Sequence, residues 1–376
     1  MFNRETWRHF DYWLFGVVLV LCVFGVVMIR SAIGGNEELA STVTSQVVFV
    51  ILGMVLILFL ASINYQALAS LTWWLYGIGI ALLIGINLVG NALFGSTRWF
   101  SLGIVNIQPS ELTKIIIIIV LADYFTRRLD QPKNLRWIGE SFVLTFGIVV
   151  WILLQPNLST SIVILVLWFA MMWISGLPTR YILIFLGIGV AVAVLLFVLV
   201  FFFQVQIPFI QQYQMDRVIN FLFPDPNARQ GEGYNVEQAL ITIGSGGWFG
   251  EGYGNGTQVQ LRFLKVRHTD FIFSSMAEEF GFVGTIIVVL LLVFVVVRCL
   301  HVARNAQDNF GGLIAYGIAI LIFFQMAVNI GVNLNVLPVT GLTLPFVSYG
   351  GSSLLSLVLG IGLVESVAAH SQKSEI

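Results

Sequence analysis

The sequence predicts an all-α, polytopic membrane protein with ten transmembrane helices, both termini in the cytoplasm, and a long extracytoplasmic loop between the seventh and eighth helices. Of the 376 residues, 58% are hydrophobic and only 10% are charged, whereas soluble domains carry about 25% charged residues. Mean hydropathy is +0.93, and the apolar residues gather in runs close to the roughly 20 residues that a membrane-crossing helix needs. The whole chain, 1–376, is therefore expected to form one integral membrane domain. A net charge of −1 gives no reason to expect nucleic acid as a partner.

Ten apolar segments follow one another along the chain. They lie near residues 12–30, 45–62, 71–90, 109–126, 141–154, 160–175, 181–203, 270–297, 311–334 and 345–367. The fifth and sixth are shorter than the span of about 17–25 residues that usually crosses a bilayer. Either flanking polar turns extend these two segments, or they do not cross the membrane completely.

Basic residues set the expected orientation, because cytoplasmic loops of membrane proteins carry an excess of Lys and Arg. With the N-terminus inside, the short outer loops hold only Arg30 and Arg98. The inner side then holds Arg4, Arg8, Arg127, Arg128, Lys133, Arg136, Arg180, Arg298, Arg304 and Lys373. The long loop at 204–269 faces outward, and Asp270 is expected at the outer membrane interface.

The long outer loop has structure of its own in the sequence pattern. The stretch "YNVEQALITIGSGG" places Val236, Ala239, Leu240 and Ile243 at helical spacing, which predicts a helix lying on or dipping into the membrane surface. The glycine-dense stretch "GSGGWFGEGYGNGTQ" follows it. Glycine permits tight turns and close backbone approach, so this tract is expected to pack around the site rather than hang free as a tether.

Asp270 stands where the polar loop gives way to an apolar run, within "RHTDFIFSSMAEEFG". An ionisable residue at membrane depth is a functional candidate by default, and a carboxylate there suits a general base or a ligand for substrate. The alternative is an interfacial acid paired with Arg262 or Arg267. Glu278 and Glu279 lie two to three turns deeper and are expected to be architectural, with one supporting helix packing and the other facing the cavity.

A second polar group comes from "STRWFSLGIVNIQPSELTK". Pro109 suits the first position of a helix, and Glu111 and Lys114 are three residues apart, so they share one helix face. An ion pair buried in the bundle is the simplest interpretation of these two. Arg98 is one of only two basic residues in the short outer loops, whereas Trp99 alone would be an ordinary interfacial aromatic residue.

Two further stretches interrupt the apolar pattern with polar and helix-breaking residues. They are "LLQPNLST", which contains Gln155, and "NIGVNLNVLPVTGLTLPFVSYGGSS", which contains Asn329, Asn333, Ser348 and Tyr349. Irregular polar backbone at membrane depth is tolerated only where it is buried in protein or lines a wet cavity. Packing polarity between helices accounts for some of these residues. Together with Glu111, Lys114 and Asp270, they predict a polar cavity that opens outward.

The histidine and cysteine residues of the sequence do not predict a metal site or a disulfide framework. His268 has no His or Cys partners in sequence, so a zinc site is not expected. Cys22 and Cys299 are isolated thiols that predict neither a disulfide framework nor a metal site.

Taken together, these stretches resemble the SEDS family of bacterial shape, elongation, division and sporulation proteins. The matching motifs are "RWFSLGIVNIQPSELTK", "QPNLSTS", "GYNVEQALITIGSGGWFGEGYGNGTQ", "RHTDFIFSSMAEEFGFVG" and "NVLPVTGLTLPFVSYGGSS". They recur in the family's order over nearly the whole chain, and "NGTQVQLRFL" is similar to the RodA-like elongation branch rather than the FtsW branch. Two departures stand out: Asn157 and Ser159 replace the usual "QPDLGT" pattern, and Leu264–Val266 replace "LPE". The first departure rules out a carboxylate role at position 157.

The resemblance implies a peptidoglycan glycosyltransferase of the bacterial cytoplasmic (inner) membrane. Such an enzyme polymerises lipid II, the undecaprenyl-diphosphate-linked disaccharide peptide, on the outer membrane face during elongation. The implied partners are a class B penicillin-binding transpeptidase and other membrane proteins of the elongation complex. No cofactor is required by a motif, although a divalent cation, Mg²⁺ or Mn²⁺, at the diphosphate is compatible with the chemistry.

The chemistry of that reaction assigns expected roles to the candidate residues. An α-linked diphosphate becomes a β-linked glycan, so one inversion requires one in-line displacement, a base for the acceptor 4-hydroxyl, and positive charge for the diphosphate. Asp270 is the expected catalytic base and Arg98 the leading diphosphate ligand. The other expected substrate-binding residues are Trp99, Gln108, Glu111, Lys114, Gln155, Arg262, Lys265, Arg267, Thr269, Ser348 and Tyr349.

Two other functions fit part of the pattern. A lipid II flippase would also need a polar groove and buried charges, but inverted repeats, which would favour a transporter, are not evident. A non-catalytic scaffold for cell-wall enzymes gives no reason for so many polar groups at outer-leaflet depth.

Overall fold

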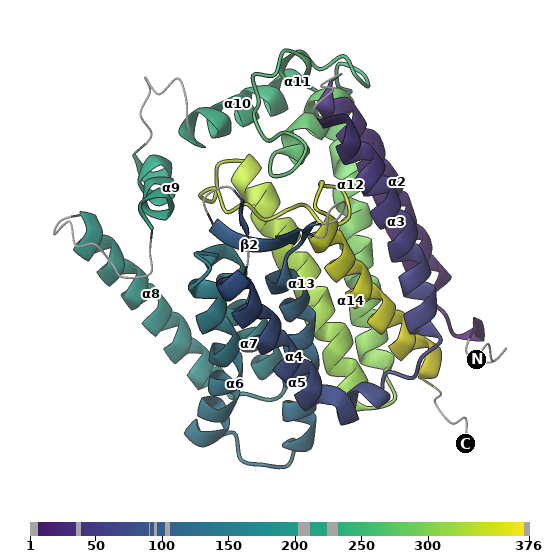
Figure 1. Ribbon diagram of the computed structural model, residues 1–376, viewed down its shortest axis with the longest axis vertical. Coiled ribbons are helices and arrows are strands. Elements are labelled where there is room, and N and C mark those ends of the chain that lie inside the picture. Colours follow the sequence, from purple (N-terminus) through teal and green to yellow (C-terminus); the bar gives the residue numbers. More distant parts are fainter. Residues whose placement is uncertain are drawn as a thin grey trace.

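The computed structural model describes residues 7–34, 39–89, 91–93, 96–101, 106–201, 211–223 and 232–371, and these ranges contain a bundle of long helices (Figure 1). Ten helices correspond one to one with the ten apolar segments of the sequence. They are α2 (Tyr12–Ile33), α3 (Ala40–Ala61), α4 (Ala67–Val89), α5 (Pro109–Arg127), α6 (Leu135–Leu153), α7 (Leu158–Ile174), α8 (Thr179–Phe201), α12 (Ile272–Asn305), α13 (Asn309–Asn333) and α14 (Gly351–His370).

Seven of these helices are long and apolar enough to cross a membrane. The remaining three are α5, which carries both Glu111 and Lys114 in its first two turns, α7, which has 17 residues, and α8. A polytopic, helical membrane protein is therefore confirmed, whereas the full ten-span topology stays a prediction. The predicted fifth segment is indeed extended by its flanking turn, because α6 begins at Leu135.

A small antiparallel sheet departs from the all-α prediction. Its strands are β1 (Asn91–Leu93), β2 (Ser96–Ser101) and β3 (Asn106–Ile107), in the order β1-β2-β3. Phe100 pairs with Ile107, and Ser101 pairs with Asn106. β1 and β3 are too short to show an alternating pattern, and the six residues of β2, "STRWFS", do not alternate between apolar and polar, so the sequence did not reveal the sheet. The sheet leads directly into Pro109 at the start of α5.

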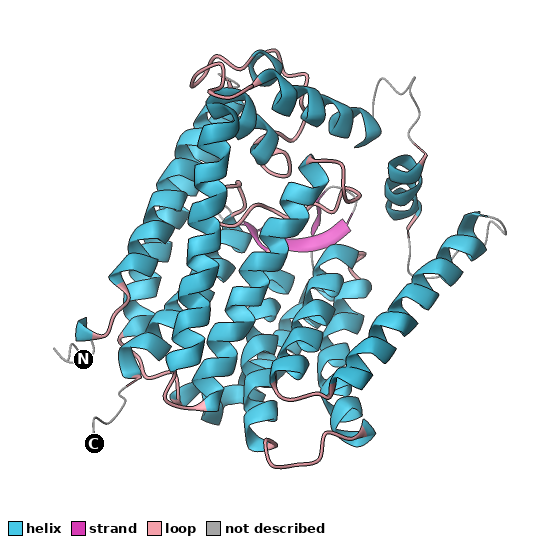
Figure 2. Cartoon of the chain, turned by 180° about the vertical axis from the view of Figure 1, so that it is seen from behind, coloured by secondary structure: helices cyan, strands magenta, loops and turns pink. Residues whose placement is uncertain are grey.

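The helices divide into central and peripheral ones. In the apolar windows of α13 and α14, 67% and 78% of residues are buried, against 17% in α4. The peripheral helices expose large apolar side chains, such as Trp74 and Leu88 of α4. Because lipid tails favour such residues, this exposed apolar surface fits the membrane. α8 runs away from the bundle along its length in both views (Figures 1 and 2).

Three shorter helices lie toward the end of the bundle opposite the two termini, the first of them to one side near the tip of α8 and the other two across that end (Figure 1). They are α9 (Gln212–Leu222), α10 (Glu232–Ser245) and α11 (Thr257–Gln260). The prediction of a helix around 234–243 is confirmed by α10, and its Ala239 is fully buried. α9 and α11 were not predicted. This end is the expected outer end of the molecule.

The glycine-rich stretch after α10 wraps around an interruption in α12. Gly281 has φ 66° and ψ −168°, so the helix breaks there. The backbone amides of Glu251 and Gly252 donate to the carbonyls of Glu278 and Glu279 at 2.9 and 3.0 Å. Hydrogen bonds lost by the break are thus replaced by the loop. The expectation that this tract packs against the protein is confirmed for the described residues.

Candidate functional site

A polar cavity of about 320 Å³ lies at the expected outer end of the bundle. Its walls come from the start of α5, the start of α7, the helix α9 and the irregular chain before α14. The lining residues are Trp99, Gln108, Glu111, Pro156, Asn157, Leu158, Ser159, Thr160, Ile162, Tyr213, Gln214, Arg217, Val218, Pro338, Val339, Thr340, Gly341 and Leu342. The interrupted segments thus do meet at a cavity, but of the three charged residues predicted there only Glu111 lines it, and its opening to the outer side stays a prediction.

Asp270 lies beside this cavity. A Cβ added to Gly341, a lining residue, would be 3.8 Å from Oδ2 of Asp270. The side chain of Asp270 is half-buried, two residues before the first turn of α12. Its backbone carbonyl accepts hydrogen bonds from the side-chain amides of Asn329 and Asn333. The carboxylate is therefore held at the cavity wall on a fixed stretch of backbone.

The predicted Glu111–Lys114 ion pair is present. Nζ of Lys114 lies 2.7 Å from Oε2 of Glu111, and the two side chains are 0% and 10% exposed. Glu111 lines the cavity, whereas Lys114 is fully buried one turn deeper in α5. Pro109 occupies the first turn of α5, as predicted. The Glu111 carboxylate therefore offsets the charge of the buried Lys114 ammonium.

Three of the remaining predicted residues lie at or behind the cavity. Trp99 and Gln108 line it. Gln155 is fully buried, and its Nε2 donates to the carbonyl of Leu83 at 3.2 Å, so this side chain holds α4 against the end of α6. The backbone of Arg98 lies in β2, but its side chain lies outside the described part of the structure.

The cations that precede Asp270 differ in their surroundings. Arg267 is buried, and its guanidinium donates to the backbone carbonyls of Ala32 and Ile33 at the end of α2. These contacts favour a structural role rather than the predicted diphosphate contact. Burial, and secondarily Arg262, lower the pKa of Arg267. Arg262 and Lys265 are exposed, and neither lines the cavity.

His268 is also part of this segment. Burial, followed by the neighbouring Arg267 guanidinium, lowers the pKa of its imidazole. A lowered pKa keeps the ring neutral at pH 7, so His268 adds no charge to the site.

Thr269, Ser348 and Tyr349 tie the segment before α12 to the chain before α14. Oγ of Ser348 donates to the carbonyl of Thr269 at 2.8 Å, and the amide of Tyr349 donates to the carbonyl of His268 at 2.9 Å. These contacts are between parts of the protein. They fix the backbone of the two residues that precede Asp270, and none of the three residues lines the cavity.

The deeper acids Glu278 and Glu279 serve the loop and the bundle. Glu278 accepts hydrogen bonds from the amides of Gln258 and Val259 at 2.8 and 3.2 Å, which satisfies the first turn of α11. Glu279 accepts from the hydroxyl of Ser31 in α2. The architectural role is confirmed, but the expectation that one of them faces the cavity is wrong, because neither lines it.

The sequence interpretation missed α9 as part of the site. Oη of Tyr213 and Nε2 of Gln214 donate to the carbonyl of Pro156 at 2.9 and 3.0 Å, which fastens α9 over the cavity. Arg217, one turn further along, lines it. The signal in the sequence is a basic residue on a short amphipathic stretch, "QYQMDRVINFL", in the same loop as the predicted cations Arg262, Lys265 and Arg267.

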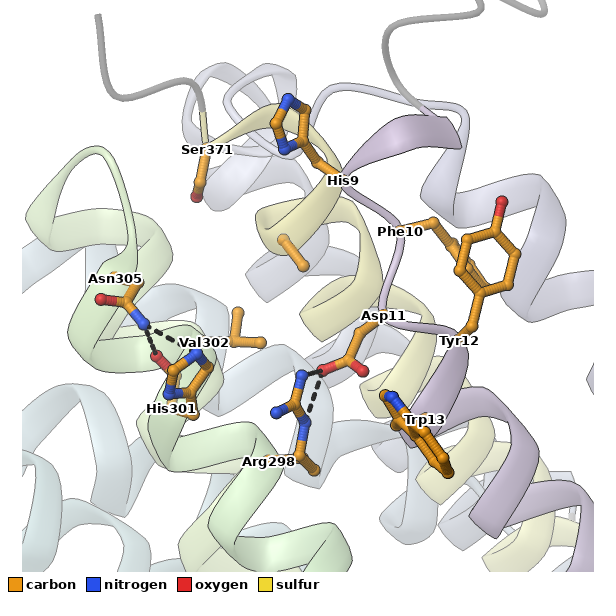
Figure 3. A pocket seen from close by; sticks show the side chains of 11 residues that line it. His9, Phe10, Asp11, Tyr12, Trp13, Arg298, His301, Val302, Asn305 and Ser371 are labelled. Carbon is orange, nitrogen blue, oxygen red and sulfur yellow. Dashed lines mark hydrogen bonds and ion pairs between the residues drawn. The ribbon is translucent and has the colours of Figure 1, made fainter. Parts of the chain in front are cut away.

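A second cavity of about 380 Å³ lies near the termini, at the other end of the bundle (Figure 3). Asp11 and Arg298 meet across it at 2.6 Å. The backbone amide of Asp11 also donates to the buried Glu365 at 2.9 Å. This cavity joins α2, α12 and α14 and has no residue in common with the one beside Asp270. Within the described residues, no cluster of three or more His, Cys, Asp or Glu side chains forms a candidate metal site.

Fold and site together define a multi-pass helical membrane protein with a polar cavity and a flanking carboxylate at one end of its helix bundle. The chain belongs to the FtsW/RodA/SpoVE family of cell cycle proteins, whose family model matches residues 12–373. The resemblance to the SEDS family is thereby confirmed.

Relatives from two branches of the family match almost the whole chain. Peptidoglycan glycosyltransferase MrdB of Escherichia coli K12 is 36% identical over 371 residues, which cover 98% of this chain and 96% of MrdB. Probable peptidoglycan glycosyltransferase FtsW of Hydrogenovibrio crunogenus is also 36% identical, covering 97% of this chain and 92% of its own. Identity alone therefore does not separate elongation from division.

Solved structures agree with the fold. A chain from a peptidoglycan synthase complex, studied for its coordination of polymerization and crosslinking, has a TM-score of 0.79 and 31% identity, covering 97% of this chain and 99% of its own. The rod shape determining protein RodA of Thermus thermophilus has a TM-score of 0.70 and 31% identity, covering 96% of both chains.

Proposed function

We propose that this peptidoglycan glycosyltransferase polymerises lipid II on the outer face of the membrane, with Asp270 as general base. The family relationship and the glycosyltransferase relatives support the reaction class. The position of the Asp270 carboxylate beside the wall of a polar cavity carries the assignment of the base. The elongation branch is favoured by the RodA-like stretch 255–264 and by the RodA structural match.

In the proposed step, the 4-hydroxyl oxygen of the acceptor sugar attacks the anomeric carbon of the donor. The bond from that carbon to the diphosphate breaks, and undecaprenyl diphosphate leaves with the bonding electrons. Asp270 accepts the hydroxyl proton, so the carboxylate becomes a neutral carboxylic acid that later returns the proton to solvent. One displacement inverts the anomeric centre, and a diphosphate is a good leaving group without strong protonation.

Positive charge stabilises the departing diphosphate in this proposal. Arg217 is the best-placed described candidate, because it lines the cavity and because guanidinium binds phosphate oxygens in a bidentate manner. Arg98 stays a second candidate from the sequence. A divalent cation would need ligands from the diphosphate itself, in keeping with the absence of a cluster of metal-ligating side chains among the described residues.

Asp270→Asn tests the proposal directly. The change preserves size and removes basicity, and loss of a general base typically costs about 10²–10⁴-fold in rate. The measurement is polymerisation of labelled lipid II by the purified full chain together with its class B transpeptidase. Asp130→Asn, on the exposed turn after α5, is the matched control and keeps normal turnover. Near-normal turnover in Asp270→Asn would refute the assignment.

The proposed partner is a class B penicillin-binding transpeptidase. Its support is the match to a chain of a peptidoglycan synthase complex, in which polymerization is coordinated with crosslinking. Co-purification of the two proteins from membranes, with a rise in polymerisation rate when the transpeptidase is present, checks this partner.

A further inference from the structure

Two buried asparagines on α13 converge on the backbone of Asp270. Asn329 and Asn333 are 1% and 0% exposed. Nδ2 of Asn329 lies 3.0 Å from the carbonyl oxygen of Asp270, and Nδ2 of Asn333 lies 2.9 Å from the same oxygen. One carbonyl thus receives two side-chain amides from consecutive turns of a neighbouring helix.

Asn333 also fixes the first turn of α12. Its Oδ1 accepts from the backbone amide of Ser274 at 3.1 Å and from the hydroxyl of Ser274 at 2.7 Å. The first amides of a helix have no partner within the helix, so Asn333 supplies one from α13. The Asn333 side chain therefore bonds both Asp270, two residues before the helix, and the first turn of α12.

Asn329 connects the same carbonyl to the cavity wall. Its Nδ2 also donates to the carbonyl of Leu342 at 2.8 Å. Leu342 and its neighbour Gly341 line the cavity, and Gly341 is the residue beside the Asp270 carboxylate. One side-chain amide thus connects the backbone of Asp270 directly to the chain that lines the cavity beside its carboxylate.

We propose that Asn329 and Asn333 are positioning residues that hold Asp270 in its reactive orientation against the cavity wall. This inference rests on the proposed role of Asp270. Neither amide bonds the carboxylate in the contacts above; both bond the peptide plane that directs it. Displacement of a catalytic group by about 1 Å costs on the order of 10²-fold in rate, so loosening this plane lowers turnover without removing a substrate contact.

Asn333→Asp is the sharpest variant. It retains an oxygen acceptor for Ser274 and replaces the amide donor to the Asp270 carbonyl with a second oxygen. We expect kcat to fall about 10- to 100-fold, with KM for lipid II within about twofold of the unaltered protein. Asn329→Asp gives the same test at the Leu342 side. Asn87→Asp is the control, because Asn87 donates within its own helix to the carbonyl of Leu83 at 3.0 Å.

Thermal unfolding of each purified full-length variant accompanies the kinetics. A fall in kcat at unchanged KM, without a matching loss of thermal stability, supports positioning. Wild-type kcat in either well-folded variant overturns it, and so does a parallel loss of kcat, substrate affinity and stability. If Asn333→Asp does not fold, Asn329→Asp decides alone. Asp270→Asn, measured in the same series, separates the two ideas: normal turnover there refutes the base, whereas an inactive Asp270→Asn beside normal asparagine variants refutes only the positioning role.

Discussion

At the scale of single residues, the buried Glu111–Lys114 pair makes a prediction that distinguishes structure from binding. Removing one partner leaves the other charge buried and uncompensated, which costs roughly 3–5 kcal/mol. Lys114→Met is therefore expected to lower the thermal unfolding temperature together with activity, and a charge-swapped double variant is expected to regain part of the stability. If Lys114→Met keeps its unfolding temperature but loses turnover, Lys114 acts as a substrate ligand and the pairing account is wrong.

Arg217 supports a second residue-scale prediction. Hydrogen bonds to charged groups contribute about 1.5–3 kcal/mol, so Arg217→Ala is expected to lower kcat/KM for lipid II about 10- to 100-fold. Arg217→Lys should recover only part of this loss, because an ammonium is a point charge without the bidentate geometry. The control is Arg304→Ala, because Arg304 is an exposed residue in the last turn of α12 and does not line the cavity. Equal kinetics in Arg217→Ala and the control would remove Arg217 from the proposed site.

At the scale of helices, contacts between residues close in sequence were predictable, whereas contacts between distant helices were not. Local periodicity predicted α10, and spacing predicted the Glu111–Lys114 pair, because both depend on residues within one or two helical turns. The asparagines meet Asp270 across 59 and 63 residues of chain. Only the folded packing of α12 against α13 brings these groups together, so a single sequence identifies them as polar but not as partners.

At the scale of elements, the loop after α10 makes a third prediction. A Cβ at Gly246 would lie 1.9 Å from the carbonyl oxygen of Ala277, whereas one at Gly244 meets nothing within 4 Å. Gly246→Ala therefore forces the loop away from α12, and overpacking of this kind costs about 1–3 kcal/mol. Gly244→Ala, two residues earlier, is the matched control.

Amide hydrogen exchange, compared between Gly246→Ala and Gly244→Ala, measures whether the loop has moved away from α12. The amides of Glu251, Gly252 and Phe282 bridge the loop and α12 and are expected to exchange faster in Gly246→Ala than in Gly244→Ala. Unchanged protection of all three would show that the loop does not depend on this close approach.

For the whole molecule, the inferred chemistry depends on which side of the membrane the cavity faces. The distribution of basic residues predicts termini inside and the loop outside, and the cavity is lined by α9 of that loop and by the starts of α5 and α7. Both native thiols, Cys22 and Cys299, are fully buried, so single surface cysteines are readable by labelling. In intact spheroplasts, Glu251→Cys is expected to react with a membrane-impermeant maleimide, and Gln307→Cys only after lysis; both positions are exposed. The reverse pattern would put Asp270 on the cytoplasmic side, and polymerisation on the outer face would then be impossible at this cavity.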